Sequence, residues 1–407
     1  MADPLFSILL PSRNRLDLLK FAIASIAEQG WSDVEIVISD NASEPSYEPY
    51  VRTLANLDVN YIRSEEALSV TANWNRALEV ARGRYVIMLG DDDALAPDSL
   101  RRFAEIIEHF HQPDVVYVMA YHYAYPGVFP HVPQGYFFEV NNSPLFNLND
   151  KPYELDRGRA RQLGEDGLHF RHNVSFNAQH FIWRRDYIAS GSGVLPFFQS
   201  PYPDYFACFV TFLTAARIVV MPRPAIIIGI SKQSFGFYYV NEQEKEGFKQ
   251  FLGSEDGVDI LASNNKKVRA ALRAEGSGHY RNWLLAALTA ERALGSSSNA
   301  KVDLARYNKM QTYERLQKVG FPGIATLEEA MALWPKTSPL KLYIKKHLFR
   351  LGLWLDKRDL LPKRFVTTKR MEGFGMYHAF SINPRDIGTH ENIMDAFHGL
   401  NQLPAQD

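Results

Sequence analysis

The chain has 407 residues, of which 46% are apolar and 22% are charged. At about 150 residues per domain, this length predicts two or three folded units, and the composition excludes wholesale disorder. The 45 Lys and Arg nearly balance the 46 Asp and Glu, so the net charge is −1, which argues against a nucleic-acid-binding protein. The single cysteine, Cys208, excludes a disulfide framework and a cysteine-based zinc cluster.

Membrane and export signals are missing from the sequence as it stands. No apolar run reaches the roughly 18 residues that a membrane-spanning helix needs. The first 15 residues lack the basic start and the cleavage site of a signal peptide. We therefore expect a soluble or peripheral protein in the cytoplasm.

The first 120 residues alternate between two kinds of pattern. Short apolar runs predict strands at 6–10, 34–38, 59–62, 85–89 and 115–119. Amphipathic segments between them predict helices near residues 16–26, 74–81 and 100–107. This alternation predicts an α/β fold with a mostly parallel sheet and helices on both faces. In such sheets the ligand binds beyond the carboxyl ends of the strands.

The pattern changes after residue 120. Residues 120–165 are crowded with aromatic residues, Pro and Asn, which predicts an ordered insertion that lines or covers a site. The aromatic side chains of 121–138 either stack on sugar rings or fill a small core of their own. A strand near 181–183, a helix over 202–216 and two short strands at 218–221 and 225–230 follow. Beyond about residue 240 the pattern is helical, so we predict domains 1–240 and 241–407.

Polar loops follow three of the predicted strands. They are Pro11 to Arg15, Ser39 to Ser43 and Gly90 to Asp93. A carboxylate can accept a hydrogen bond from a pyrimidine ring N–H, and clustered aspartates can hold Mg²⁺ or Mn²⁺ against a diphosphate. Aspartates left bare at a strand end repel one another, so a cation is the natural neutraliser. Taken singly, each loop could be an ordinary turn; their succession favours a nucleotide-diphosphate site.

The order of these motifs resembles glycosyltransferase family 2, whose members are inverting enzymes with the GT-A fold. The resemblance is carried by PSRNR, SDNAS, the helical segment NWNRAL from Asn73, and GRYVIMLGDDDAL. It covers residues 5–120 well and continues weakly to about residue 235. It implies a nucleotide-sugar donor, a divalent metal ion and inversion at the anomeric carbon.

The resemblance also implies roles for particular residues. In the donor site it places residues beside the nucleoside, at the base and near the diphosphate: Pro11, Ser12, Arg13, Asp40, Asn41, Ser43, Asn73 and Arg76. Asp92 is the first choice for metal ligation and Asp93 for the second ligand, while Asp91 contacts the ribose or replaces one of them. Gly90 occupies the first position of the family's usual acidic motif, which leaves this register open.

An inverting transfer needs a general base for the acceptor hydroxyl. The segment from Pro203 to Pro224 resembles the family's sequence of acid, helix, strand and proline, which implies that Asp204 is the base. A helix N-cap is the competing interpretation of Asp204. Glu165 and Asp166, which look like part of a turn, are the alternative base.

Many family members carry a histidine near the metal after this strand, whereas residues 229–234 contain none. Either the metal has fewer protein ligands, or Lys232 supplies positive charge to the diphosphate directly.

One segment near the C-terminus is strongly basic. Residues 336–370 contain eleven Lys and Arg against two Asp, a net charge of +9. Its apolar residues recur at helical spacing around Trp354, a pattern typical of a helix on an anionic membrane surface. A helix packed on the catalytic domain, or a face that binds phosphate or anionic polysaccharide, fits the same pattern.

The sequence thus predicts a metal-dependent inverting glycosyltransferase with a Mn²⁺ or Mg²⁺ cofactor. Its donor is a nucleotide sugar, with UDP favoured, and its acceptor is a saccharide or lipid-linked hydroxyl in surface polysaccharide or glycoconjugate synthesis. The non-enzymatic alternative is a carbohydrate-binding or scaffold protein on the same fold. A sugar-nucleotide pyrophosphorylase is disfavoured because PSRNR lacks the glycines of that class.

Overall fold

The protein is described here from a computed structural model. It describes residues 3–129, 132–139, 143–234, 236–237, 265–273, 278–295, 300–318, 347 and 385–401. Of this part of the chain, no helix combines the length and apolar character needed to span a bilayer. Most of the basic segment 336–370 lies outside the described residues, so its predicted roles stay predictions.

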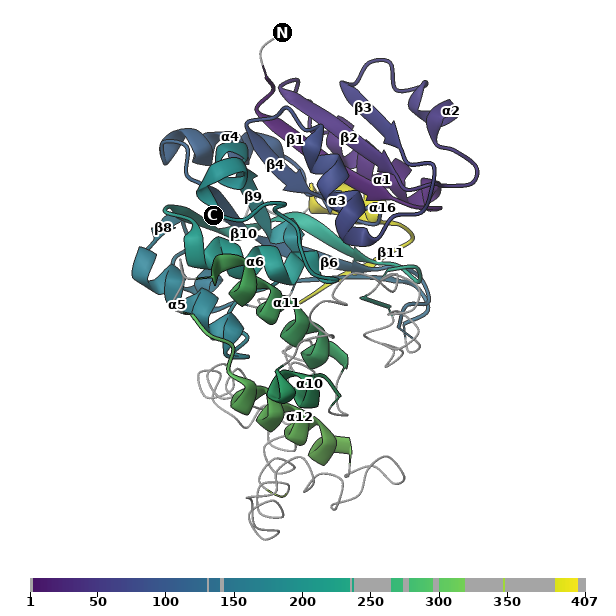
Figure 1. The fold of residues 1–407 in the computed structure, drawn as a ribbon. Coiled ribbons are helices and arrows are strands. Elements are labelled where there is room, and N and C mark those ends of the chain that lie inside the picture. The colour runs from purple at the N-terminus through teal and green to yellow at the C-terminus, as the bar shows by residue number, and fades with distance from the viewer. Residues whose placement is uncertain are drawn as a thin grey trace.

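One mixed sheet organises the molecule (Figure 1). Its strands are β1 (Phe6–Ser12), β2 (Val34–Asp40), β3 (Val59–Arg63), β4 (Tyr85–Met88), β5 (Ala94–Leu95), β6 (Val115–Ala124), β7 (Gly135–Glu139), β8 (Tyr153–Leu155), β9 (Phe181–Arg184), β10 (Ile218–Ile230) and β11 (Arg385–His390). The main path runs β11-β7-β6-β9-β4-β1-β2-β3, and β10 pairs with β5, β6 and β8. Strands β4, β1, β2 and β3 are parallel to their neighbours in this group, which confirms the predicted parallel sheet.

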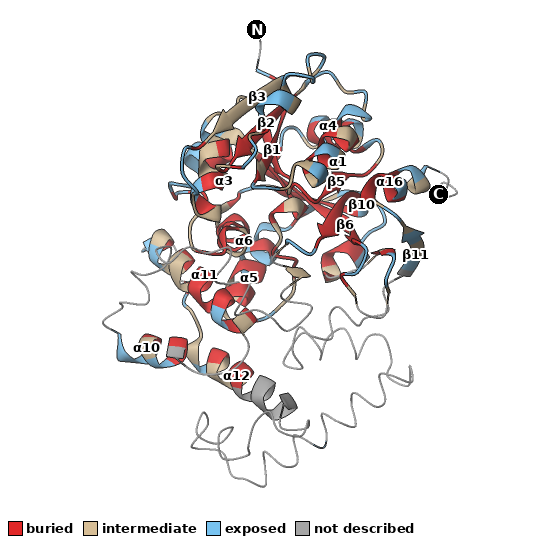
Figure 2. Ribbon diagram, turned by 90° about the vertical axis from the view of Figure 1, so that its right-hand side faces the viewer, coloured by how far each residue is buried: buried red, intermediate tan, exposed pale blue. Residues whose placement is uncertain are grey.

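Helices cover both faces of the sheet, as the alternation predicts. The helices are α1 (Leu16–Ala27), α2 (Glu48–Val51), α3 (Val70–Glu79), α4 (Ser99–His109), α5 (Arg157–Leu168), α6 (Pro203–Thr214), α10 (Lys266–Arg273), α11 (Gly278–Leu294), α12 (Leu304–Lys318) and α16 (Ile393–Leu400). Ile8 and Leu10 of β1 pack in a core with α1 and α4, while Leu9 faces the core of α3, α5 and α6. This period-two alternation is what a strand buried on both faces requires. In Figure 2 the central strands β1, β2, β6 and β10 are largely red, whereas β3 and β11, at the two ends of the main path, are intermediate or exposed.

Two predicted elements differ from the structure. The segments 218–221 and 225–230 form one strand, β10, whose register against β6 shifts between Met221 and Ile226. Pro222 and Pro224 lie in this irregularity, where the ladder does not need their missing N–H groups. Residues 157–168 form helix α5, although no helix was predicted between residues 120 and 165.

The aromatic insertion is used mainly as core. Tyr123, Phe137 and Phe138 lie in β6 and β7 and are buried, together with Val128. Their partners include α16 from the far end of the chain. These residues therefore pack in a core, as the second alternative predicts, but that core is shared with β10 and α16 and is not their own.

The C-terminal residues do not stay apart from the N-terminal sheet. Strand β11 pairs antiparallel with β7, and α16 packs against α1, β5 and β10. Helix α11 packs on α5 and α6, where the Trp283 indole N–H donates to the Gly167 carbonyl at 2.6 Å. The predicted division at residue 240 therefore separates segments that share one core.

Candidate functional site

The three predicted polar loops meet at the carboxyl ends of β1, β2 and β4. Ser12, paired in register with Asp40, donates from its hydroxyl to Asp91 Oδ2 at 2.7 Å. The Ser12 hydroxyl also lies 3.0 Å from the Tyr47 hydroxyl. One serine thus links the first loop to the turn of residues 90–93, named here the acidic turn, and to the loop after β2.

Asp40 is fully buried and holds its own loop. Its carboxylate accepts hydrogen bonds from the Ser43 backbone N–H at 2.9 Å and from the Tyr61 hydroxyl at 2.8 Å. The Arg63 guanidinium lies 3.6 Å away as an ion-pair partner. These contacts fix the loop conformation, and the predicted role of Asp40 in reading the base stays a prediction.

Asp93 joins three elements of the sheet. Its carboxylate accepts from the backbone N–H of Gly90 at 2.7 Å and of Gly229 at 2.8 Å, and from the Gln179 side-chain amide at 2.7 Å. Both carboxylate oxygens are therefore occupied by N–H donors, and only 1% of the residue is exposed. This arrangement suits a structural tie better than the predicted second metal ligand.

Asp92 keeps one oxygen uncommitted. Its Oδ2 accepts from the Ser231 hydroxyl at 2.8 Å and from the Ser231 backbone N–H at 3.3 Å. No hydrogen bond to Oδ1 is formed by any residue that the structure describes. The backbone carbonyl of Asp92 accepts from the Tyr125 hydroxyl at 3.2 Å. Among the three aspartates, Asp92 is therefore the one with a free ligand atom.

Asp91 is neutralised by Arg15. The guanidinium Nη1 lies 2.9 Å from Asp91 Oδ1, and Nη2 donates to the Gln233 carbonyl at 2.6 Å. Burial acts to lower the pKa of Arg15, but Asp91 and Asp92 outweigh it and raise that pKa. Arg15 therefore connects the first loop both to the acidic turn and to the loop after β10.

The acidic turn carries more negative charge than its partners neutralise. Burial, followed by repulsion from Asp91, raises the pKa of Asp92; burial and then Asp92 raise the pKa of Asp93. Within the described ranges, no three His, Cys, Asp or Glu side chains are arranged to hold a metal ion. Mg²⁺ commonly binds through one or two carboxylates and completes its shell with substrate phosphates and water. The free oxygen of Asp92 fits that mode of binding, with Asp92 as its protein ligand.

Other predicted donor residues have mainly structural contacts. Asn41 bonds through its amide to both the N–H and the carbonyl of Leu68, and Ser43 Oγ accepts from the Asn14 N–H. Asn73 is buried and accepts from the Ser39 hydroxyl at 2.7 Å, which ties α3 to β2.

The three predicted cations, Arg13, Arg76 and Lys232, differ in their exposure. Arg76 donates from Nη2 to the Arg63 carbonyl, while its buried Nη1 has no hydrogen-bond partner in the described part of the chain. Lys232 is exposed, and its Nζ lies where a side chain at Gly127 would sit, 2.8 Å from the ideal Cβ position. Arg13 is exposed and Pro11 is half-buried beside it.

Asp204 lies at the second residue of α6 and does not cap it. The residue before the helix is Tyr202, and Asp204 Oδ1 accepts from the adjacent Tyr205 N–H at 2.9 Å. Although part of the residue is exposed, dense packing around its carboxyl raises the pKa of Asp204 to about 7. A carboxylate with this pKa is suited to accepting a proton near neutral pH.

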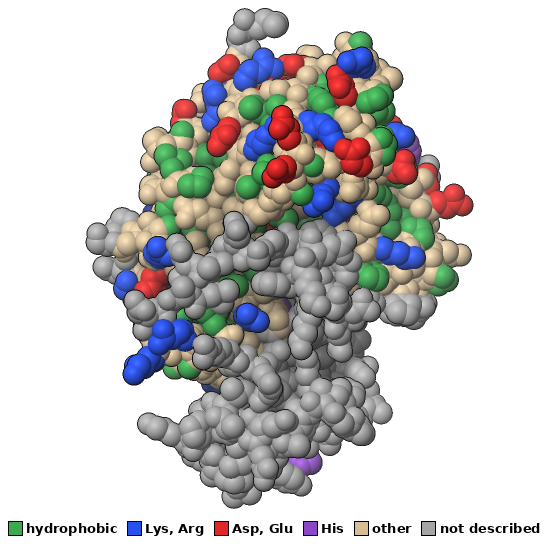
Figure 3. Space-filling model, turned by 45° about the vertical axis from the view of Figure 1, so that its right-hand side comes forward, with side chains coloured by type: hydrophobic (Ala, Val, Ile, Leu, Met, Phe, Trp, Pro, Cys, Tyr) green, Lys and Arg blue, Asp and Glu red, His purple; other side chains and the backbone are tan. Residues whose placement is uncertain are grey.

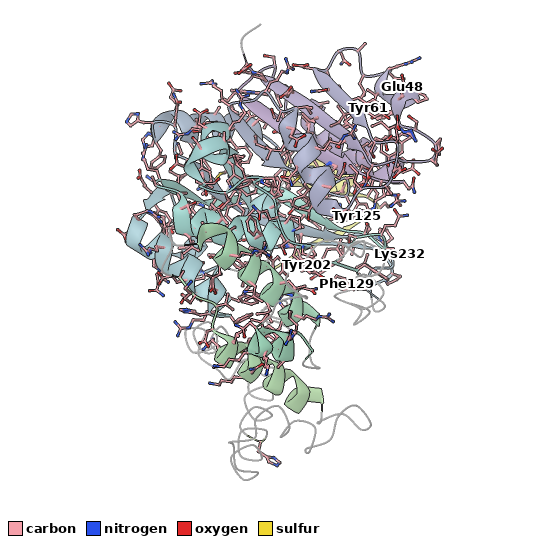
Figure 4. The ribbon with its side chains drawn as sticks, viewed as in Figure 1. Glu48, Tyr61, Tyr125, Phe129, Tyr202 and Lys232 are labelled. Carbon is pink, nitrogen blue, oxygen red and sulfur yellow. The ribbon has the colours of Figure 1, made fainter. Side chains whose placement is uncertain are left out.

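The segment from Phe176 to Gln179 connects Asp204 to the acidic turn. Phe176 packs against Tyr205 with ring centroids 4.9 Å apart, and Gln179 binds Asp93. Three residues of extended chain span at most about 11 Å, so a short stretch of backbone links the helix that carries Asp204 to the turn that carries Asp93. In the view of Figure 4, Tyr202, next to α6, and Tyr125, which binds Asp92, are labelled near the middle of the molecule, with Lys232 to their right and Phe129 below.

The alternative base residues lie in helix α5, not in the predicted turn. Glu165 pairs with Arg161 at 3.3 Å along the helix. The buried Asp166 accepts from the Asn173 amide at 2.7 Å and from the Arg171 guanidinium at 3.1 Å. These contacts hold the chain that follows α5, so Asp204 is the better candidate for the base.

Four residues with clear contacts in the site were not predicted. Ser231 and Gln179 bind two of the aspartates, and Tyr47 and Tyr125 brace the loops around them. Arg15 was inside the PSRNR motif but was assigned no role. Three of these five residues carried a sequence signal: Arg15 lies in the first polar loop, Ser231 directly follows a predicted strand, and Tyr125 lies in the aromatic insertion predicted to line or cover a site.

Comparison with known proteins shows a family resemblance over the first part of the chain. Residues 7–179 match the model of Glycosyl transferase family 2. This part of the chain is similar to that family. With the match, the mixed sheet and its helical C-terminal region confirm the GT-A fold predicted from the sequence.

Individual relatives are similar over about a quarter of the chain. A putative colanic acid biosynthesis glycosyl transferase, WcaA, of Escherichia coli strain K12 is 33% identical over 103 residues, which are 25% of this chain and 37% of that protein. A Campylobacter jejuni GalNAc(5)-diNAcBac-PP-undecaprenol beta-1,3-glucosyltransferase is 34% identical over 100 residues, 24% of this chain and 32% of that protein. The chain thus spans about a third of the length of these relatives.

The solved structures include S. aureus TarS 1-349. It has 16% sequence identity and a TM-score of 0.45, and the alignment covers 86% of this chain and 90% of that one.

Gly229 is predicted to be intolerant of any side chain. An ideal Cβ there would lie 1.7 Å from the Asp92 carbonyl oxygen, so Gly229→Ala must push β10 away from the acidic turn. We expect a loss of about 2–4 kcal/mol in unfolding free energy, measured by urea denaturation. Gly30→Ala is the control, because its Cβ meets nothing within 4 Å and only its φ of +61° costs about 1 kcal/mol. Equal losses in both variants would contradict the close approach.

Asp204→Asn is predicted to stabilise the protein at alkaline pH. The folded-state pKa of about 7 lies above the ordinary value of 3.8, so ionisation of Asp204 destabilises the folded protein. This destabilisation is absent below pH 4 and complete above pH 7. The melting temperature of Asp204→Asn should therefore exceed that of the wild type at pH 8 by at least about 2 °C, and the two should converge at pH 4. Asp186→Asn, an exposed site, should show no such divergence.

Proposed function

We propose that this protein is an inverting glycosyltransferase that moves a sugar from a nucleotide-diphosphate donor to a hydroxyl group of its acceptor. The observation that carries the proposal is the convergence of the three loops through Ser12, Asp91 and Arg15 around an Asp92 oxygen that no described residue satisfies. A buried carboxylate with a free oxygen, next to other carboxylates, favours a cation. The family match to residues 7–179 supports the same conclusion.

In the proposed reaction, Asp204 takes the proton of the acceptor hydroxyl while the oxygen of that hydroxyl attacks the anomeric carbon. The bond from that carbon to the donor phosphate breaks, and the nucleoside diphosphate leaves with the electron pair. A divalent cation held by Asp92 would neutralise charge on that leaving group. Arg76 and Lys232 are the protein cations assigned to the donor, and Arg15 keeps Asp91 fixed beside them.

The resemblance assigns Asp40 to the base, which is compatible with a uridine or a thymidine donor, and uridine is favoured only by its frequency in that family. The acceptor is proposed to be a saccharide or a lipid-linked saccharide in surface polysaccharide synthesis. Two relatives support this assignment, since their names refer to colanic acid and to an undecaprenol diphosphate carrier. The expected site of action is the cytoplasm, with segment 336–370 as the candidate contact to an anionic membrane surface.

The surface of the described N-terminal part is mixed in charge. Figure 3 shows Lys, Arg, Asp and Glu interspersed over the upper half of this face, without a large patch of one sign. A neutral saccharide acceptor is compatible with such a surface, whereas a polyanion as large as a nucleic acid is not favoured by it.

Asp92→Asn is predicted to abolish the metal-dependent part of donor binding. A thermal-shift panel of UDP-, dTDP- and GDP-sugars, with and without Mn²⁺, should give the largest Mn²⁺-dependent shift for a UDP-sugar in the wild-type protein. Asp92→Asn should lose most of that shift because its amide is a much weaker cation ligand. Asp98→Asn, whose carboxylate forms an exposed ion pair with Arg101, is the matched control. A full shift in Asp92→Asn would contradict the assignment, and no shift with any sugar nucleotide would favour the scaffold alternative.

Asp204→Asn is predicted to lower turnover by about 10²–10⁴-fold, since general-base catalysis contributes this much. The wild-type rate should rise with pH and level off above about pH 7, because only the ionised carboxylate accepts the proton. Single-turnover rates with donor and a hydroxyl acceptor across pH 5–9 measure both effects. If Glu165→Gln showed the loss and Asp204→Asn did not, the base would be the residue on α5.

A further inference from the structure

The segment of residues 385–401, named here the C-terminal strap, packs next to the acidic turn. It consists of β11 and α16, and Ile393, Ala396 and Phe397 of α16 are buried. The same core contains Ala94, which follows the acidic turn, and Ile230, which precedes Ser231. The strap therefore packs on the two chain segments that hold Asp92 and Asp93.

Helix α16 is built to stay in this position. Asn392 caps it by accepting from the backbone N–H groups of Met394 and Asp395. On the outer side, His398 Nε2 lies 2.7 Å from the Glu28 carboxylate of α1. Strand β11 adds five register pairs to β7, from Arg385 to His390. Figure 1 shows α16, in yellow, beside α1 and far from the other C-terminal helices.

A chain of direct contacts runs from the strap to Asp92. The Tyr123 hydroxyl donates to the His390 carbonyl at 2.8 Å. Its ring meets Tyr125 edge-on, with centroids 4.9 Å apart, and the Tyr125 hydroxyl donates to the Asp92 carbonyl at 3.2 Å. Burial raises the pKa of Tyr125 well above its usual range, so this hydroxyl stays protonated and can donate.

There is little space for this chain to rearrange. A Cβ at Gly135 would lie 2.0 Å from the Tyr123 hydroxyl and 2.2 Å from the His390 carbonyl oxygen. A Cβ at Gly229 would lie 3.2 Å from the Tyr125 ring as well as against Asp92. Both glycines permit backbone contact that any side chain would prevent, which fixes the aromatic pair between the strap and the turn.

We propose that the C-terminal strap positions the acidic turn for donor binding, with Tyr125 as the positioning residue that acts on Asp92. The inference rests on the proposed function for its ligand, a nucleoside diphosphate with a divalent cation. Tyr125 and the strap fix the backbone position of Asp92 and are assigned no contact with the bound cation. That contact is assigned to Asp92.

The decisive comparison is between Phe397→Ala and Phe197→Ala. Both phenylalanines are buried, at 2% and 1% exposure, so both substitutions remove a comparable core side chain. Phe197 packs on Trp183, which pairs with Val86 at the opposite end of β4 from the acidic turn. Any effect common to the two variants is therefore general destabilisation.

Hydrogen–deuterium exchange of the ligand-free full-length protein tests the strap without relying on the proposed activity. In Phe397→Ala we expect amides of residues 89–96 and 226–231 to exchange at least about tenfold faster than in the wild type. Phe197→Ala should leave them at the wild-type rate. Equal exchange in the two variants would overturn the proposal, whether or not the protein binds a nucleotide.

Binding and kinetics then test the link to function. In Tyr125→Phe, which loses only the hydroxyl, and in Phe397→Ala, the Kd for UDP with Mn²⁺ should rise about tenfold by calorimetry. The donor KM should rise likewise while the acceptor KM stays constant. If exchange increases but neither constant changes, the strap is structural only and the proposal is wrong. If the wild type itself binds no nucleotide, the proposed function fails while the exchange result still stands.

Discussion

The structure depends on the hydrogen bonds that join the acidic turn after β4 to the end of β10. Asp93 receives the N–H of Gly229, and Asp92 receives both the N–H and the hydroxyl of Ser231. Burying these carboxylates is costly unless each one is given donors. The donors come from segments that lie more than 130 residues further along the chain, so the site exists only when the sheet is complete. The fold and the site are therefore stabilised by the same contacts, and a change to one is a change to the other.

The rest of the architecture brings those donors into place. Parallel strands β4, β1 and β2 deliver three polar loops to one edge, because their carboxyl ends point the same way. Strand β9 and the short 3₁₀ helix before it place Gln179 at the turn, and the same segment packs under α6. Helix α11 then covers α6, with His279 Nδ1 3.1 Å from the Tyr205 hydroxyl. The candidate base is thus carried by a helix that the C-terminal half of the chain supports.

Much of the fold could be predicted from periodicity, and the errors have a common cause. All five strands predicted in the first 120 residues form; four of them are apolar runs that are largely buried, and β3 is a half-buried strand at the end of the sheet. Helix α5 was missed because its glycines, such as Gly164 and Gly167, weaken the helical pattern; they are there so that α5 can approach Leu213 and Phe209 of α6. Strand β11 was missed because its partner β7 lies about 250 residues away, and no local pattern records such a pairing. Local signals predict elements that are decided locally, and long-range packing decides the others.

The sequence predicted which residues form the candidate site better than it predicted what each of them binds. Asp40, Asn73 and Asp93 stand where the motif placed them, yet their polar atoms are occupied by Tyr61, Ser39 and Gly229. A sequence shows which groups could bind a ligand, whereas only the structure shows which of them are already satisfied by the protein. Among the predicted residues that the structure describes, Asp92 Oδ1 and the buried Arg76 Nη1 have no hydrogen-bond partner, while Arg13 and Lys232 are exposed. The proposed donor, a diphosphate with a divalent cation, would bring the cation to the carboxylate and its phosphates to the exposed basic groups. A neutral saccharide alone would bring neither.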